Sequence, residues 1–177
     1  MDEYILVVSD SHLENKTLYH LTNKFKETLY KFHCGDSNLN NDNPLLNSFQ
    51  VVCGNHDNLL DFPPFIVLKP FIITHGHKEN VYFTDELLVK LAKNHDCTVV
   101  FHGHTHIPRD QYIDNIHIIN PGSLLINRGS YGYATYGLYH IKSDTIRFYR
   151  TSDDSDVTDE VLADGIHVLN EIRNEED

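Results

Sequence analysis

The chain lacks several features that define whole classes of protein. It has only three cysteines, Cys34, Cys53 and Cys97, and their odd number and spacing indicate neither a disulfide framework nor a thiolate zinc site. No apolar run approaches the roughly 18 residues that a membrane span needs. The sequence opens with two acids, Asp2 and Glu3, instead of the basic segment that opens a signal peptide. These absences predict a protein of a reducing, cytoplasmic setting without a membrane-spanning segment.

Positive charge is also scarce. The 177 residues include 14 Lys and Arg against 26 Asp and Glu, which gives a net charge of −12. Residues 151–177 contain ten acids and one arginine, whereas residues 1–150 are close to charge balance. Neither part has the basic stripe that long nucleic acids require. The charge therefore argues against an extended nucleic-acid partner, but not against an enzyme that admits one small phosphate ester.

The chain does have short apolar runs that alternate with amphipathic stretches, as expected of one α/β domain. Four Val- and Ile-rich runs are typical of strands buried on both faces: Tyr4–Ser9, Phe49–Cys53, Phe71–Thr74 and Thr98–Phe101. Four later runs, separated by turn residues, predict antiparallel hairpins: Gln111–Ile113, His117–Ile119, Tyr136–Ile141 and Thr145–Tyr149.

Two helices are expected between the early strands. Apolar residues at spacings of three and four predict the first, with a stripe of Leu18, Leu21, Phe25, Leu29 and Phe32. The second is expected to begin at Thr84 as its N-cap and to bury Leu87, Leu88 and Leu91.

Five apolar runs end in residues of the types that bind metal ions: Asp10-Ser11-His12, Gly35-Asp36, Gly54-Asn55-His56-Asp57, His75-Gly76-His77 and Gly103-His104-Thr105-His106. In an α/β sheet, the loops that follow the strands converge on one edge. The mixed oxygen and nitrogen donors suit Mn, Fe, Zn or Ni better than Mg or Ca. They exceed what one ion with an open position can use, so the pattern predicts two ions about 3.5–4 Å apart.

These five motifs, in this order, resemble the calcineurin-like metallophosphoesterases. The short distances between them, together with Ile119–Ser123 (INPGS), resemble the small YfcE-like phosphodiesterase branch of that superfamily. The resemblance extends from about Tyr4 to Arg150. It implies a four-layer α/β/β/α sandwich in a single domain, with the metallophosphoesterase part spanning residues 1–150.

The resemblance also implies which side chains bind the two expected divalent ions, with manganese placed ahead of iron, zinc and nickel. The first ion would be held by Asp10, His12, Asp36 and His106. The second would be held by Asp36, Asn55, His75 and His104. Asp36 would be shared, which agrees with the chemistry of the set, since only a carboxylate offers an oxygen to each of two cations.

By the same resemblance, His56 is the group that assists the leaving group, and Asp57 would orient its ring. The implied reaction is hydrolysis of a small phosphodiester by attack of a metal-bridging hydroxide. Two alternatives stay open: a phosphomonoesterase, and a non-catalytic scaffold such as the retromer subunit of this fold. The retromer subunit lacks this histidine, so His56 and the complete ligand set favour the enzyme. Arg128 is either a phosphate contact or a solvated loop arginine.

Residues 151–177 are expected to form an acidic helical extension. Leu162, Ile166, Leu169 and Ile172 recur at helical spacing, although Gly165 weakens the pattern. We expect this helix to lie against the rest of the chain or against a second copy of it, so a homo-oligomer is one reading of the stripe.

Overall fold

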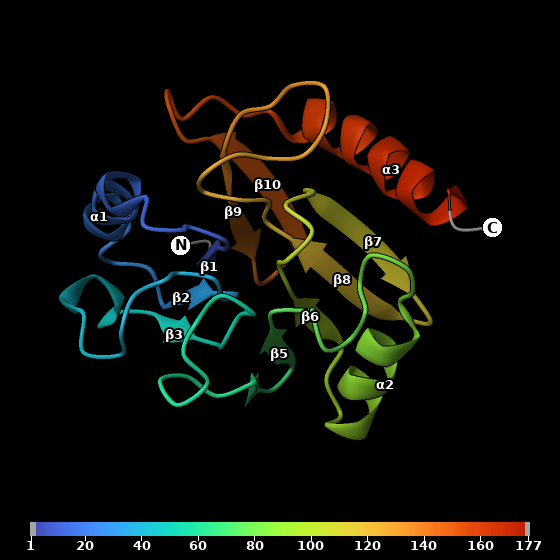
Figure 1. Ribbon diagram of the computed structural model, residues 1–177, viewed down its shortest axis with the longest axis horizontal. Helices are drawn as coiled ribbons and strands as arrows, with labels where there is room; N and C mark the ends of the chain where they lie inside the picture. Colours follow the sequence, from blue (N-terminus) through green and yellow to red (C-terminus); the bar gives the residue numbers. More distant parts are fainter. Residues whose placement is uncertain (1–2, 176–177) are drawn as a thin grey trace.

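Two five-stranded sheets face each other in the computed structural model, which describes residues 3–175 (Figure 1). Residues 1–2 of the expected 1–150 domain and residues 176–177 of the expected C-terminal extension lie outside the described residues. The first sheet has the order β10-β9-β1-β2-β3 and the second β4-β5-β6-β8-β7. The strands are β1 (Tyr4–Val8), β2 (Tyr30–His33), β3 (Gln50–Val51), β4 (Phe65–Leu68), β5 (Phe71–Thr74), β6 (Val99–Phe101), β7 (Arg109–Ile113), β8 (Ile116–Asn120), β9 (Thr135–His140) and β10 (Thr145–Arg150).

Parallel strands form the centre of each sheet. β1, β2 and β3 pair in parallel in the first sheet, and β5, β6 and β8 do so in the second. The antiparallel hairpins β7–β8 and β9–β10 confirm two of the expected turns. Pro121-Gly122 is not a hairpin turn, because the chain crosses there from β8 in one sheet to β9 in the other. Strand β4, which lies at an edge, had no sequence prediction.

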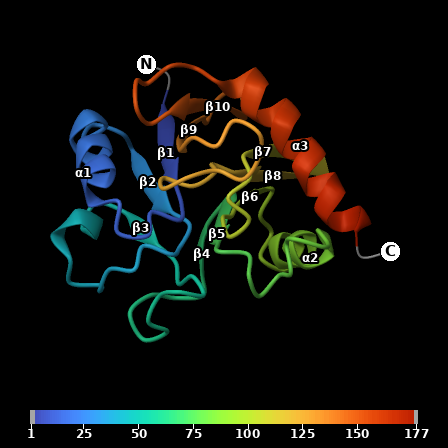
Figure 2. The ribbon, with the colours of Figure 1, turned by 45° about the horizontal axis from the view of Figure 1, so that its top comes forward.

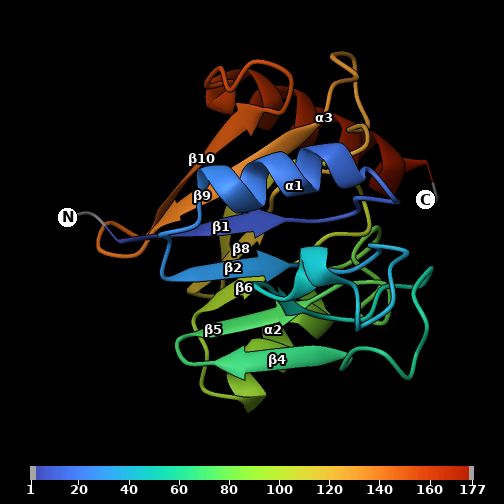
Figure 3. The ribbon, with the colours of Figure 1, turned by 90° about the vertical axis from the view of Figure 1, so that its left-hand side faces the viewer.

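Helices cover the outer faces of the two sheets, as Figure 3 shows for α1. α1 (Asn15–Lys24) buries Leu18 and Leu21 against the first sheet, and α2 (Glu86–Asn94) buries Leu88 against the second. A short 3-10 helix, η1 (Pro44–Leu46), lies beside α1. The core between the sheets contains the aromatic rings of Phe32, Phe71, Phe101 and Tyr139. This arrangement confirms the α/β/β/α sandwich in a single domain.

Both early helices differ from their predicted extents. α1 ends at Lys24, and Tyr30–His33 instead form β2. Leu29 is therefore exposed and Phe32 points into the inter-sheet core, because burial between two sheets outweighs an accidental continuation of helical spacing. In α2 the buried residues include Val89 rather than Leu87, which is 42% exposed.

The acidic C-terminal segment forms α3 (Thr158–Asn174), which contacts β10 and β7, the edge strands on one side of the sandwich (Figure 2). Its buried stripe includes Val161, Gly165 and Leu169, whereas Ile166 is 46% exposed. A Cβ at Gly165 would lie 2.5 Å from the carbonyl oxygen of Pro108, so the glycine permits the close packing. The division of the chain at residue 150 stays a prediction.

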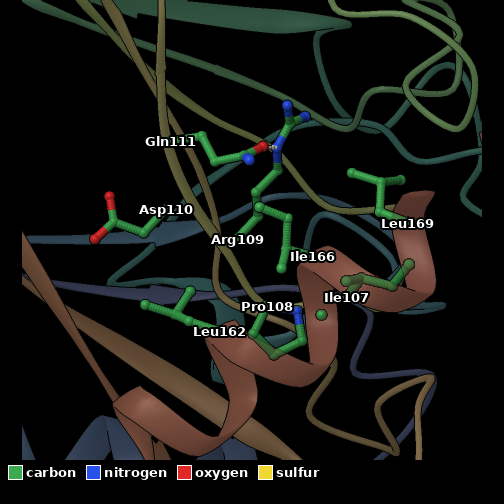
Figure 4. A pocket seen from close by; sticks show the side chains of 9 residues that line it. Ile107, Pro108, Arg109, Asp110, Gln111, Leu162, Ile166 and Leu169 are labelled. Carbon is green, nitrogen blue, oxygen red and sulfur yellow. Dashed lines mark hydrogen bonds between the residues drawn. The ribbon is translucent and has the colours of Figure 1, made fainter.

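A small cavity of about 120 Å³ lies between α3 and β7 (Figure 4). Its lining includes Ile107, Pro108, Leu162 and Ile166, and none of its residues belongs to the predicted site. None of the helices within residues 3–175 has the length and apolar character needed to cross a membrane.

Candidate metal centre

The seven expected metal ligands lie just after the carboxyl ends of five parallel strands, at one edge shared by both sheets. The first sheet supplies Asp10 and His12 after β1, Asp36 after β2 and Asn55 after β3. The second sheet supplies His75 after β5, and His104 and His106 after β6. The loops are tied together by backbone hydrogen bonds from Asp10 to Gly35 and from Gly103 to His75. Strand order therefore explains how residues far apart in sequence meet.

Two overlapping groups of these side chains have donor atoms that all lie within 4.8 Å of one another: Asp10, His12 and His106, and Asp10, Asp36 and His75. In the first group, Asp10 Oδ1 is 3.1 Å from His106 Nε2. In the second, Asp36 Oδ2 is 3.3 Å from His75 Nε2. The same Asp36 oxygen is 3.9 Å from His12 Nε2, so this carboxylate also reaches both groups.

The donor atoms fit divalent cations. Asp10 Oδ1 is buried without a hydrogen-bond partner, although an unpaired carboxylate oxygen is costly to bury. The Nε2 atoms of His12 and His106 face each other at 3.4 Å. Burial alone would lower the pKa of His75, but its hydrogen bond to Asp36 and the charge of Asp10 raise it to about 9. The carboxylates of Asp10 and Asp36 thus favour positive charge between them and His75, and bound cations would provide that charge.

Asn55 and His104 lie beside the second group. Asn55 Oδ1 is 3.1 Å from His75 Nε2, and the ring of His104 is 5.2 Å from that of His75. Burial, followed by the positive charge of His75, lowers the pKa of His104 to about 4. The neutral imidazole that results is the form that binds metal ions.

The backbone at the site is held in an uncommon conformation. Five of the seven expected ligands have φ between 42° and 69°, in the left-handed region: Asp10, His12, Asp36, His104 and His106. Non-glycine residues rarely adopt it, and such residues cluster at functional sites. The strain is compensated by contacts from elsewhere in the fold, such as the hydrogen bond that Ser123 Oγ donates to the carbonyl oxygen of Asp10 at 2.9 Å.

His56 and Asp57 sit in different surroundings. His56 is exposed, its ring lies 5.6 Å from the ring of His12, and its backbone N–H donates to Asp36 Oδ1 at 2.8 Å. Asp57 accepts hydrogen bonds from the backbone amides of Asp36 at 2.7 Å, Gly54 at 2.9 Å and Asn38 at 2.9 Å. Among residues 3–175 these bonds turn the Asp57 carboxylate toward the amides of two site loops, and its expected role in orienting the His56 ring stays a prediction.

Asn38 was missed by the sequence analysis. Its Oδ1 lies 2.8 Å from His12 Nδ1, and its Nδ2 donates to the carbonyl oxygen of His56 at 3.2 Å. The sole sequence signal for Asn38 is its position two residues after Asp36, and this signal is weak because the polar loop contains several asparagines.

His77 packs near the site with its ring 5.4 Å from that of His75. His102 is buried and hydrogen-bonds at Nδ1 to Gly103, and burial lowers its pKa to about 3.

The comparisons with known proteins agree with this geometry. The family model for the calcineurin-like phosphoesterase superfamily domain matches residues 4–144. The probable metallophosphoesterase YsnB of Bacillus subtilis is 30% identical over 152 residues, which covers 82% of this chain and 89% of that protein.

Two solved structures are similar to the whole arrangement of sheets and helices. A predicted phosphoesterase from Streptococcus pneumoniae superposes with a TM-score of 0.80 at 28% identity, covering 85% of this chain and 91% of the other. The phosphoesterase YfcE from E. coli superposes with a TM-score of 0.60 at 22% identity, covering 87% and 96%. The chain therefore belongs to the calcineurin-like phosphoesterase superfamily, the metal-dependent phosphoesterases that its five motifs resemble.

Proposed function

We propose that the chain hydrolyses phosphodiesters with two divalent ions held at this cluster. The observation that supports the proposal most directly is the pair of overlapping donor groups at one edge of the sandwich, which share Asp10, with Asp36 within 3.9 Å of a histidine in each. Asp10, His12, Asp36 and His106 would hold one ion, and Asp36, Asn55, His75 and His104 the other. Such ions supply Lewis-acid stabilisation of the ester oxygens and acidify a bound water.

The protein's own contribution to the reaction is the placement of charge and of one proton donor. The buried carboxylates of Asp10 and Asp36 would hold the cations, and left-handed backbone at five of the seven expected ligands would restrict how those side chains are presented. His56, exposed beside His12, would donate a proton to the departing oxygen as the phosphorus–oxygen bond breaks.

A diester fits because the cluster has side chains on two flanks. His56 adjoins His12, whereas Tyr82 adjoins His104, whose ring lies 5.1 Å away. One substituent of the phosphorus would leave on the His56 side while the other lies on the Tyr82 side.

The test is turnover of bis(4-nitrophenyl) phosphate and of 4-nitrophenyl phosphate by protein loaded with manganese. We expect the diester to be hydrolysed with the higher kcat/KM. A higher value for the monoester would instead support a phosphomonoesterase. Binding of two ions without turnover of either compound would support the scaffold.

The role of His56 is tested by His56→Ala across a series of aryl diesters. We expect metal binding to persist and kcat to fall by about 10²–10⁴-fold for poor leaving groups, with a smaller loss for 4-nitrophenolate, which needs less proton donation. An equal loss across the series would mean that His56 binds substrate without donating a proton.

A further inference from the structure

Arg128 differs from every other arginine of the chain. The sequence has five arginines, and four of them lie within 4.0 Å of a carboxylate: Arg109, Arg147, Arg150 and Arg173. Within residues 3–175, Arg128 forms no ion pair, although the chain has a net charge of −12. A cation left without a carboxylate in so acidic a protein is available to an anionic ligand.

Arg128 also lies next to the metal centre. Its backbone N–H donates to the carbonyl oxygen of His106 at 2.9 Å, and its guanidinium carbon is 5.7 Å from the centre of the Tyr82 ring. That ring packs edge-on against His104, and the Tyr82 hydroxyl donates to the carbonyl oxygen of His104 at 3.4 Å. The Arg128 backbone thus contacts one expected ligand, His106, while the guanidinium lies over the ring of Tyr82, which contacts another, His104.

The segments that bear these two side chains are held in place by the fold. Beside Arg128, the buried Asn127 side chain accepts from Ser123 N at 2.7 Å, and Ser130 N donates to Asp164 of α3 at 3.2 Å. Beside Tyr82, Arg173 of α3 donates to the Tyr82 carbonyl oxygen at 3.1 Å. Helix α3 therefore contacts both segments, and its hydrogen bonds hold in place the backbone that carries Arg128 and Tyr82.

We propose that Arg128 and Tyr82 form a subsite for an anionic group, a phosphate or a carboxylate, on the part of the substrate that keeps its phosphorus after hydrolysis. The inference rests on the proposed function, in which the leaving group departs on the His56 side. A guanidinium suits both anions, because its planar fork donates two hydrogen bonds to their oxygens. The preferred substrates would then be diesters with a second negative charge on the retained alcohol.

Two substrates separate this charge from all other features. Thymidine 5′-(4-nitrophenyl phosphate) and its 3′-phosphorylated form release the same 4-nitrophenolate and differ by one phosphate on the retained nucleoside. We expect the wild-type protein with manganese to show a kcat/KM about tenfold higher for the 3′-phosphorylated ester, the order expected of a charge-assisted hydrogen bond. Arg128→Gln should abolish the preference, and Arg128→Lys should keep part of it.

Arg147→Gln is the matched control, because it removes the same charge from an exposed arginine of β10 that pairs with Asp156. It should keep the preference. An equal kcat/KM for the two esters in the wild-type protein, or a preference that survives Arg128→Gln, would overturn the proposal.

A binding measurement separates failure of the subsite from failure of the proposed function. Calorimetry on the manganese-loaded protein compares thymidine 3′,5′-bisphosphate with the 5′-monophosphate. Tighter binding of the bisphosphate that Arg128→Gln removes, without hydrolysis of either ester, would support the subsite and refute the phosphodiesterase. Equal binding of the two nucleotides by the wild-type protein would refute the subsite.

Discussion

The substitution Asp57→Ala distinguishes two roles of Asp57: orienting the His56 ring, as the sequence predicts, and anchoring the backbone of the site loops. The Asp57 carboxylate accepts hydrogen bonds from the backbone amides of Asp36, Gly54 and Asn38, at 2.7–2.9 Å. Asp36 and Gly54 are buried, whereas Asn38 is exposed and its amide can bond to water instead. A hydrogen bond to a charged group contributes about 1.5–3 kcal/mol, so loss of the two buried bonds should cost about 3–6 kcal/mol.

The assay is denaturant unfolding of the metal-free protein, with Asp42→Ala as the control, since Asp42 is an exposed carboxylate on a nearby loop. Asp57→Asn retains one acceptor oxygen and should lose about half as much stability. Metal affinity should fall as well, because Asp36 loses its backbone anchor. A variant as stable as the control, with turnover lost mainly for esters with poor leaving groups, would refute this reasoning and return Asp57 to a role through His56.

Two further predictions concern the fold. Leu169→Ala should destabilise the protein by about 2–4 kcal/mol and Ile166→Ala by less than about 1 kcal/mol, because Leu169 lies on the buried face of α3 and Ile166 is 46% exposed. Equal losses in urea unfolding would contradict the observed helix face. The buried ring of His117 hydrogen-bonds to Asp110 at 2.6 Å and Asp144 at 2.5 Å, and although burial opposes it, these carboxylates raise its pKa. The stability that His117→Gln removes should therefore be largest below about pH 6.5 and shrink as the pH rises through the raised pKa; a loss that grows with pH would contradict this assignment.

The positions of the candidate ligands could be predicted from sequence because each follows a short apolar strand. Asp10, Asp36 and His75 are marked by runs such as YILVVS and FIIT, and parallel strands bring their carboxyl ends to one edge. No knowledge of side-chain contacts is needed for that step. The two-sheet architecture came from the family resemblance, since periodicity alone does not assign strands to sheets.

Other features depend on contacts that a linear pattern does not encode. Two of the three backbone amides that donate to Asp57, those of Asp36 and Asn38, are about 20 residues away, and no spacing rule identifies them. Gly165 weakens a helix by propensity, yet close packing on Pro108 requires it, so the buried stripe is displaced from Ile166. Phe32 fits a helical period but is buried between the sheets as part of β2. In each of these examples, contacts between segments far apart in the sequence determined the outcome.

The most direct test of the two-ion centre is the number of ions bound per chain, measured by elemental analysis after equilibrium dialysis against manganese. We predict two ions for the wild-type protein, one for Asn55→Ala, and loss of both for Asp36→Ala, whose carboxylate lies within 3.9 Å of a histidine in each donor group. A single ion in the wild-type protein, or two ions retained by Asp36→Ala, would contradict it.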